Sequence, residues 1–358
     1  MSGSRGKILP DDIIEEILSR LPVKSLLKLR CVCKSWCTLI SDPNFINLHL
    51  KHSLENNDQT ILRGHLASEV YLLECKQRLV KLDSPPNLSM PSFMYNDGTL
   101  SCCNGLVCLT DDGNTICLWN PSTRRHRILP QPLVARNPSG YTFNMGFAYN
   151  SIEKDYVVVR LVVTARFQNL CEVEIYSLRD NSWTRIQNIS HTICRDNKGV
   201  VFFVGALHWL GVRDVDYLGI KVMPDIIIAL DVTSKKFREF QLPQCEHINL
   251  EWKRLGNQCW TSISILNGCL CIMRENDIHD EVWVMKEYGT KESWFKLYII
   301  EQFGCPLSVT KSREIVLQKK GILCLYDPKH QSARSVKTKP VPNGFTLGTT
   351  FVDSLVPL

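Results

Sequence analysis

The sequence lacks the signatures of the common enzyme and metal-binding classes. No two of its 16 cysteines have the C-x-x-C spacing, and its nine histidines are scattered without the close spacing of zinc ligands. There is no G-x-S-x-G motif, no H-E-x-x-H motif and no glycine-rich phosphate loop followed by Lys-Ser or Lys-Thr. We therefore expect a protein that is not an enzyme and that uses neither a metal nor a cofactor.

One short motif, Cys102-Cys103 before Asn104-Gly105, could suggest a nucleophile beside a turn. No histidine is placed by the sequence to activate a thiol there. We interpret the pair as small residues entering a strand.

Long apolar runs are also missing. The most apolar segment, residues 156–165, contains Arg160 and is too short to span a bilayer. No apolar run of the signal-peptide type precedes the first predicted helix. We therefore expect no membrane partner and a reducing location, the cytosol or the nucleus, where cysteines act as small hydrophobic residues.

Charge of one sign does not dominate. Lys and Arg number 42 against 36 Asp and Glu, which gives a modest net charge of +6. Basic clusters occur at residues 124–127 and between Lys311 and Lys339, but aromatic residues are not interleaved with them as on a stacking platform. We interpret both clusters as solvated faces and expect no nucleic-acid partner.

The segment from Leu9 to Leu50 predicts a small helical module. A first helix is expected over residues 11–21, with acidic residues in its first turns beside the positive end of the helix dipole. Pro22 ends it, a second helix is expected over residues 23–40, and residues 44–50 can add one or two turns. The apolar surface exceeds what so small a module can bury, so it is either a cap on the rest of the chain or a docking surface.

The order of residues in this module resembles the F-box, the module that docks on the Skp adaptor of a Skp–cullin–F-box ubiquitin ligase. The resemblance rests on Leu9-Pro10, the segment from Leu18 to Pro22, the pair Leu26 and Leu29, and the run from Val32 to Trp36. It implies a Skp-family adaptor as partner and, through it, a cullin. Carried over position by position, the adaptor-facing residues would be Leu9, Pro10, Ile14, Leu18, Leu21, Pro22, Val23, Leu26, Val32, Cys33 and Trp36.

The remaining three hundred or so residues repeat a pattern of short strands. An apolar strand, a polar turn and a basic or aromatic strand recur at residues 70–85, 116–130, 173–187, 226–243, 282–297 and 323–336. A period of about fifty residues is typical of a β-propeller, whose antiparallel blades must stack to cover their apolar faces. The aromatic residues that recur at equivalent places are expected in the cores between blades: Trp119, Tyr176, Trp183, Trp209, Trp283 and Trp294.

These repeats resemble the plant F-box-associated interaction domain, often described as a kelch-like repeat region. The resemblance rests on residues 101–109, 118–130, 147–161 and 173–183. The Gly-Gly pair of kelch blades is absent, and the last repeats are degenerate. We therefore expect a multi-domain, α plus all-β protein: a helical F-box domain over residues 1–52, and over residues 53–358 an antiparallel kelch-like β-propeller of six or seven blades. The sequence leaves open whether the ring closes.

Together the two resemblances imply a substrate receptor that holds a target protein near the ubiquitin carrier and needs no bond-making residues. The alternatives are a scaffold that binds the adaptor without causing degradation and, least favoured, a propeller enzyme with a small ligand in its central channel. The target surface is predicted in long loops, where Arg and aromatic residues suit a hot spot. The candidates are Arg136, Arg166, Phe167, Arg195, Arg213, Tyr217, Trp252 and Arg254.

Overall fold

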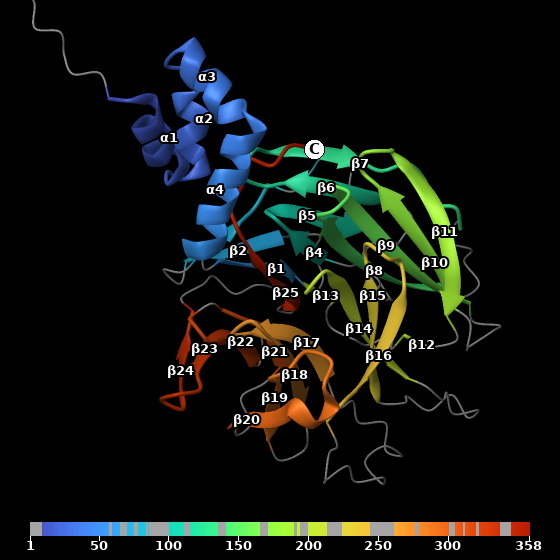
Figure 1. Cartoon of the computed structure of the whole chain (residues 1–358). Coiled ribbons are helices and arrows are strands. Elements are labelled where there is room, and N and C mark those ends of the chain that lie inside the picture. Colours follow the sequence, from blue (N-terminus) through green and yellow to red (C-terminus); the bar gives the residue numbers. More distant parts are fainter. Residues whose placement is uncertain are drawn as a thin grey trace, which may run out of the picture.

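The computed structural model shows a helical module on one face of a six-bladed β-propeller (Figure 1). It describes residues 9–56, 59–64, 70–74, 78–83, 85, 100–110, 115–134, 141–164, 171–189, 192–193, 200–212, 224–243, 261–275, 279–300, 305–310, 312–319, 322–336 and 345–358. Among these residues, none of the helices is long and apolar enough to cross a membrane.

The helical module contains α1 (Asp11–Ser19), α2 (Val23–Leu29), α3 (Lys34–Ser41) and α4 (Pro43–Asn56). Asp11 and Asp12 occupy the first turn of α1, where their carboxylates complement the helix dipole as predicted. One apolar cluster forms the core of the module, and its buried members from the four helices are Leu18, Val23, Leu26, Ile40 and Phe45.

The prediction of one helix over residues 23–40 is wrong, because the chain leaves the helical conformation before Lys34. Cys33 has an extended backbone, with φ −156° and ψ 164°, and α3 begins after it. Residues 31–33 are Cys, Val and Cys, all of weak helix propensity, so the sequence does little to hold the helix together here.

The last helix is longer than predicted. The carboxylate of Asp42 accepts hydrogen bonds from the backbone N–H groups of Asn44 (2.8 Å) and Phe45 (3.4 Å), and Pro43 occupies the first helical position. This is a strong helix start, because it satisfies donors that have no partner within the helix. From it α4 continues for 14 residues to Asn56, past the domain boundary predicted after residue 52.

The strands form six antiparallel sheets, each of which is one blade. Blade 1 contains β25 (Phe345–Phe351), β1 (Gln59–Gly64), β2 (Val70–Glu74) and β3 (Arg78–Lys81); blade 2 contains β4 (Leu100–Cys103), β5 (Leu106–Thr110), β6 (Ile116–Asn120) and β7 (Arg125–Ile128); blade 3 contains β8 (Tyr141–Asn150), β9 (Asp155–Thr164), β10 (Cys171–Ser177) and β11 (Ser182–Ile189). Blade 4 contains β12 (Thr192–Ile193), β13 (Val201–Phe203), β14 (Ala206–Val212), β15 (Ile226–Asp231) and β16 (Phe237–Gln241); blade 5 contains β17 (Thr261–Leu266), β18 (Cys269–Glu275), β19 (Asp280–Met285) and β20 (Trp294–Ile300), with the short helix η1 (Lys291–Ser293); blade 6 contains β21 (Cys305–Val309), β22 (Ile315–Lys319), β23 (Ile322–Asp327) and β24 (Ser332–Ser335).

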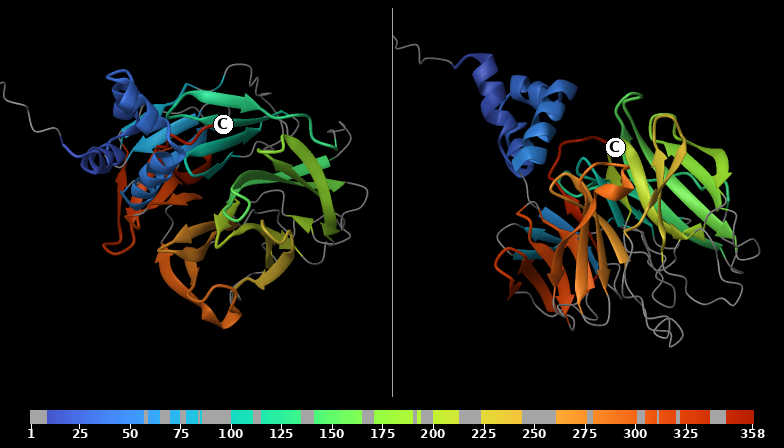
Figure 2. Two further views of the ribbon diagram at one scale, coloured as in Figure 1. Left: turned by 45° about the horizontal axis from the view of Figure 1, so that its top comes forward. Right: turned by 60° about the horizontal axis from the view of Figure 1, so that its bottom comes forward.

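The ring is closed, and it has six blades. Strand β25 pairs antiparallel with β1, so blade 1 combines strands from distant parts of the sequence. Six apolar clusters fill the six interfaces between neighbouring blades, including the interface of blade 6 with blade 1. The view along the ring in Figure 2 shows the blades arranged around the centre. Because the ring closes, each blade packs its apolar faces against the two neighbouring blades.

The prediction for the recurring aromatic residues is confirmed. The six residues lie in four of the cores between blades: Trp119 between blades 1 and 2, Tyr176 and Trp183 between blades 2 and 3, Trp209 between blades 3 and 4, and Trp283 and Trp294 between blades 4 and 5. Two indoles also bond to the preceding blade, since Trp183 donates to the Pro130 carbonyl (2.9 Å) and Trp294 to the Gln241 carbonyl (3.0 Å). These aromatic residues therefore hold blades together.

The ring has two faces with different connections. The face toward the helical module, here called the turn face, carries the hairpin turns β4–β5, β6–β7, β8–β9, β10–β11, β13–β14, β15–β16, β17–β18, β19–β20, β21–β22 and β23–β24 (Figure 2). Side-chain oxygens of Asn120, Asn150, Asp231 and Asp327 cap four of these turns by accepting backbone N–H groups two and three residues on. Because antiparallel strands alternate in direction, β7, β9, β14 and β16 end on the opposite face.

Candidate docking surface

Helix α1 has apolar residues on two sides. Leu18, on the inner side, is 3% exposed and packs into the core of the module with half-buried Ile14. On the outer side Ile13 is 43% exposed and Ile17 is 49% exposed, and Leu9, four residues before Ile13, is 53% exposed. Residues four apart lie above one another on a helix, so Ile13 and Ile17 form one line along α1. Leu9, Ile13 and Ile17 are called the outer stripe.

The predicted adaptor-facing residues fall into three groups by exposure. Leu9, Pro10, Pro22, Val32 and Cys33 are exposed, while Ile14, Leu21 and Trp36 are half-buried. Leu18, Val23 and Leu26 are 3%, 2% and 0% exposed and form the core of the module. These last three side chains lie beneath the exposed residues, and their predicted role in adaptor binding stays a prediction.

The sequence reasoning did not include Ile13 and Ile17 among the docking residues. The signal was present, because α1 carries more apolar residues than one packing face requires. With apolar residues on both sides, helical spacing alone could not decide which side faces inward.

Charged residues surround this apolar surface. Glu16 and Arg20 form an ion pair one turn apart on exposed α1, and the hydrogen bond from Arg20 lowers the pKa of Glu16. Lys24 and Lys28 are exposed on α2. An apolar patch with a charged rim is typical of a protein-docking surface.

The exposed Cys33 lies at the start of α3. Its sulfur is 3.1 Å from the Ser35 hydroxyl oxygen. Hydrogen bonds from Ser35 and from the backbone N–H of Trp36 lower the pKa of the Cys33 thiol. Cys33 therefore has more thiolate character than an ordinary surface cysteine.

Helix α4 connects the module to the propeller. His49 lies 3.0 Å from the Leu21 carbonyl oxygen through its Nε2 atom, and His52 lies 3.1 Å from the Ser19 hydroxyl oxygen through its Nδ1 atom. Both contacts bring α4 against the end of α1. On its propeller side, Leu50 belongs to the apolar core between blades 2 and 3. The docking surface is therefore carried by a helix that is anchored in the propeller.

The eight predicted target-binding residues lie outside the described residues. These are Arg136, Arg166, Phe167, Arg195, Arg213, Tyr217, Trp252 and Arg254. The described strands β7, β9, β14 and β16 precede seven of these eight residues in the sequence, and all four strands end on the face opposite the turn face. Arg195 follows β12, which pairs with the end of β14.

The described residues contain no grouping of three or more His, Cys, Asp or Glu side chains that could hold a metal ion. Burial raises the pKa of Cys102 well above its ordinary value and that of Cys103 to about 12. Asn104 and Gly105 form the turn between β4 and β5, with φ of 52° and 78°. The Cys-Cys-Asn-Gly motif is thus a strand and a turn, as predicted, and its thiols are poor nucleophiles.

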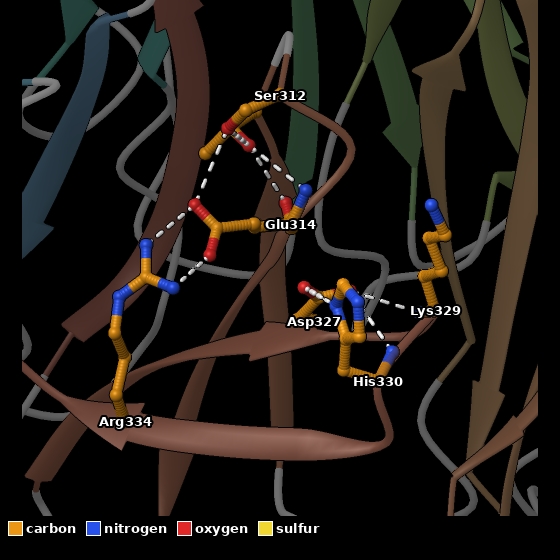
Figure 3. Close-up of polar contacts among 7 residues, drawn as sticks. Ser312, Glu314, Asp327, Lys329, His330 and Arg334 are labelled. Carbon is orange, nitrogen blue, oxygen red and sulfur yellow. Dashed lines mark hydrogen bonds and ion pairs between the residues drawn. The ribbon is translucent and has the colours of Figure 1, made fainter.

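A polar cluster on blade 6 also has a structural role (Figure 3). Arg334 of β24 pairs with Glu314, with one nitrogen–oxygen distance of 2.7 Å, and Ser312 donates to the same carboxylate. In the β23–β24 turn, Asp327 lies 2.6 Å from the His330 ring and accepts the backbone N–H groups of Lys329 and His330. These contacts shape two exposed turns.

The chain is thus a two-domain protein, in which a helical module with an exposed apolar stripe is carried on a closed ring of six antiparallel blades. Residues 7–48 match the F-box domain, and residues 65–347 match the F-box associated beta propeller domain. The chain belongs to the family of F-box proteins with this associated propeller, as its two resemblances predicted.

Plant proteins are among its relatives. The chain is 28% identical to F-box protein CPR1 of Arabidopsis thaliana over 97% of this chain and 88% of that protein. It is 30% identical to the F-box/kelch-repeat protein At3g23880 of the same plant, over 89% of this chain and 87% of the relative. Among solved structures, a functionally unknown protein from Desulfotomaculum acetoxidans is 11% identical with a TM-score of 0.45, covering 82% of this chain and 99% of that one.

Proposed function

We propose that this chain is the substrate receptor of a Skp–cullin–F-box ubiquitin ligase. The F-box helices bind a Skp-family adaptor, and the propeller binds a target protein that is then ubiquitinated and degraded. The observation that carries this proposal is the outer stripe, three exposed apolar residues on α1 and just before it, in an F-box whose core does not include them. Burial of these side chains by a partner removes apolar surface from water and so makes the free energy of binding more favourable.

In this proposal the protein contributes position and no bond-making group. A target held on the propeller stays close to the ubiquitin carrier, which raises the effective concentration of its lysines. The two faces of the ring suit this task. The F-box lies on the turn face, and β7, β9, β14 and β16, which precede most of the predicted target residues in the sequence, end on the opposite face.

We also propose a reducing compartment, the cytosol or the nucleus. The described cysteines have free thiols, and several of them line the cores between blades. Free thiols persist where glutathione and thioredoxin keep them reduced.

The adaptor interaction can be tested with a double substitution in the outer stripe. Ile13→Asp with Ile17→Asp places two charges in the proposed interface and leaves the module core untouched. Loss of central apolar anchors costs on the order of 2 kcal/mol or more, so we expect adaptor affinity to fall about thirtyfold or more. The measurement is the dissociation constant of the full chain for a purified Skp adaptor, with helix content checked by circular dichroism.

The matched control is Ile152→Asp, which adds the same charge at an isoleucine that is 74% exposed on the propeller. It should bind the adaptor as the wild type does. Equal binding by the double variant and the control would contradict the proposed docking surface. Degradation is tested separately: once a target is known, its level should rise when the proteasome is inhibited, and an unchanged level would favour a scaffold.

A further inference from the structure

The seven residues that follow β25 run from the propeller to the F-box. This segment, Val352 to Leu358, is called the strap. It leaves blade 1 on the turn face, crosses blade 2 and passes beside α4 (Figure 1). Four of its residues are buried: Val352, Ser354, Leu355 and Val356. Asp353 and Leu358 are half-buried, and Pro357 is exposed.

Blade 2 holds the strap by its backbone. The side-chain nitrogen of Asn120, itself fully buried, donates hydrogen bonds to the carbonyl oxygens of Ser354 (3.1 Å) and Val356 (2.9 Å). The Ser122 hydroxyl donates to the Asp353 carboxylate at 2.6 Å. A strap that follows this course is fixed to the β6–β7 turn at three points.

Gly105 in the neighbouring β4–β5 turn leaves room for the strap. A Cβ atom at this position would lie 2.5 Å from both the Ser354 hydroxyl oxygen and the Val352 carbonyl oxygen. Its φ of +78° is also a conformation that favours glycine. Two adjacent turns of blade 2 are therefore shaped around the strap.

The side chains of the strap enter two different cores. Val352 and Val356 belong to the core between blades 2 and 3, together with Leu50 of α4. Leu355 belongs to the core of the F-box, where its neighbours include Leu18 and Phe45. A short segment thus contributes to the interior of both domains.

We propose that the strap fixes the F-box at one orientation on the propeller. Helix α4 attaches the module to the propeller at one place, where Leu50 enters the core between blades 2 and 3. The strap adds an attachment at a different place, so rotation of the module would require removing Leu355 from the F-box core or breaking the Asn120 bonds. The consequence for the ligase, which rests on the proposed function, is that a bound target has a set direction and distance from the adaptor.

The test uses Asn120→Asp in the full chain. The substitution keeps the side-chain oxygen that caps the β6–β7 turn, where it accepts from Ser122 and Thr123. It replaces the donor to the two strap carbonyls with an oxygen that repels them. The matched control is Asn150→Asp, because Asn150 caps the β8–β9 turn of blade 3 with the same pair of backbone bonds and its nitrogen donates to Val232, within the propeller.

Two measurements on the chain without the adaptor report whether the strap is held in place. Hydrogen exchange of peptides covering residues 345–358 and α4 should become about tenfold faster in Asn120→Asp and not in Asn150→Asp. Small-angle X-ray scattering should show a larger maximum dimension for Asn120→Asp only. A second variant, Leu355→Ala, releases the strap from the F-box side and should also enlarge the maximum dimension.

Unchanged exchange in Asn120→Asp would overturn the proposal, and so would faster exchange with an unchanged scattering profile, because α4 would then hold the F-box by itself. Adaptor affinity of Asn120→Asp should stay within about threefold of the wild type, since the outer stripe is untouched. A wild-type chain that fails to bind the adaptor would refute the proposed function, and the exchange and scattering results would still decide the role of the strap.

Discussion

His208 provides a pH-dependent contribution to stability that can be worked out from its surroundings. It lies in β14 and is fully buried between blades 4 and 5, with its ring stacked on Phe240 at 6.0 Å between centroids. Its Nδ1 atom is 3.3 Å from the Val201 carbonyl oxygen, and its Nε2 atom is 2.7 Å from the Tyr288 hydroxyl. A carbonyl can only accept, so Nδ1 carries the proton of the neutral ring and Nε2 accepts from Tyr288.

Burial lowers the pKa of His208 from 6.5 to about 4, even though the backbone contacts act in the opposite direction. The unfolded chain therefore takes up a proton at this residue near pH 6.5, whereas the folded chain does so only near pH 4. Stability conferred by the neutral ring is complete above pH 6.5 and is lost as the pH falls toward 4. At 1.36 kcal/mol for each unit of pKa difference, the loss is about 1.4 kcal/mol at pH 5.5 and about 3 kcal/mol at pH 4.

The perturbation is His208→Gln, which cannot be protonated in this range. Urea unfolding of wild type and variant at pH 7.5, 5.5 and 4 gives the free energy of unfolding of each. Carboxylates elsewhere titrate equally in both proteins, so the difference between the two isolates His208. We expect the wild type to lose about 3 kcal/mol more than the variant between pH 7.5 and pH 4. A difference that stays constant with pH would refute the assignment of a buried neutral ring.

Two further predictions concern the F-box helices. Leu18→Ala should lower the free energy of unfolding of the module by about 2–5 kcal/mol and Ile17→Ala by less than about 0.5 kcal/mol, because only Leu18 fills the core; thermal melts followed by helical circular dichroism compare them, and equal losses would show that the two sides of α1 are misassigned. Cys33 should react first with limiting iodoacetamide at pH 7.5, well before Cys108 and Cys271, whose pKa values are raised by burial; peptide mass spectrometry reads the order, and early alkylation of a buried thiol would contradict it.

Features that repeat along the chain could be predicted from the sequence. A strand, a polar turn and an aromatic strand recur in every blade, so the propeller and the place of residues such as Trp119 and Trp209 follow from pattern alone. The number of blades could not be predicted, because the last repeats are unevenly spaced. The structure has six blades: the last repeats form a complete blade 6, and β25 supplies the fourth strand of blade 1.

Features that depend on a distant partner could not be predicted. Nothing local in residues 345–351 indicates pairing with β1, and nothing in residues 352–358 indicates a path into the F-box core. The two apolar sides of α1 are a similar case. Ile17 and Leu18 are adjacent and equally apolar, and only the position of α4 decides that Leu18 faces inward.

The arrangement of β25 and the strap has a consequence for synthesis of the protein. A ribosome must translate residue 351 before β1 can obtain its partner strand, and residue 355 before the F-box core is filled. A chain cut short before this point lacks both at once. Its ring stays open along β1, and its helices miss a core residue, so one truncation destabilises both domains at once. The folding of the F-box and the folding of the propeller are thereby coupled through the same short stretch of chain.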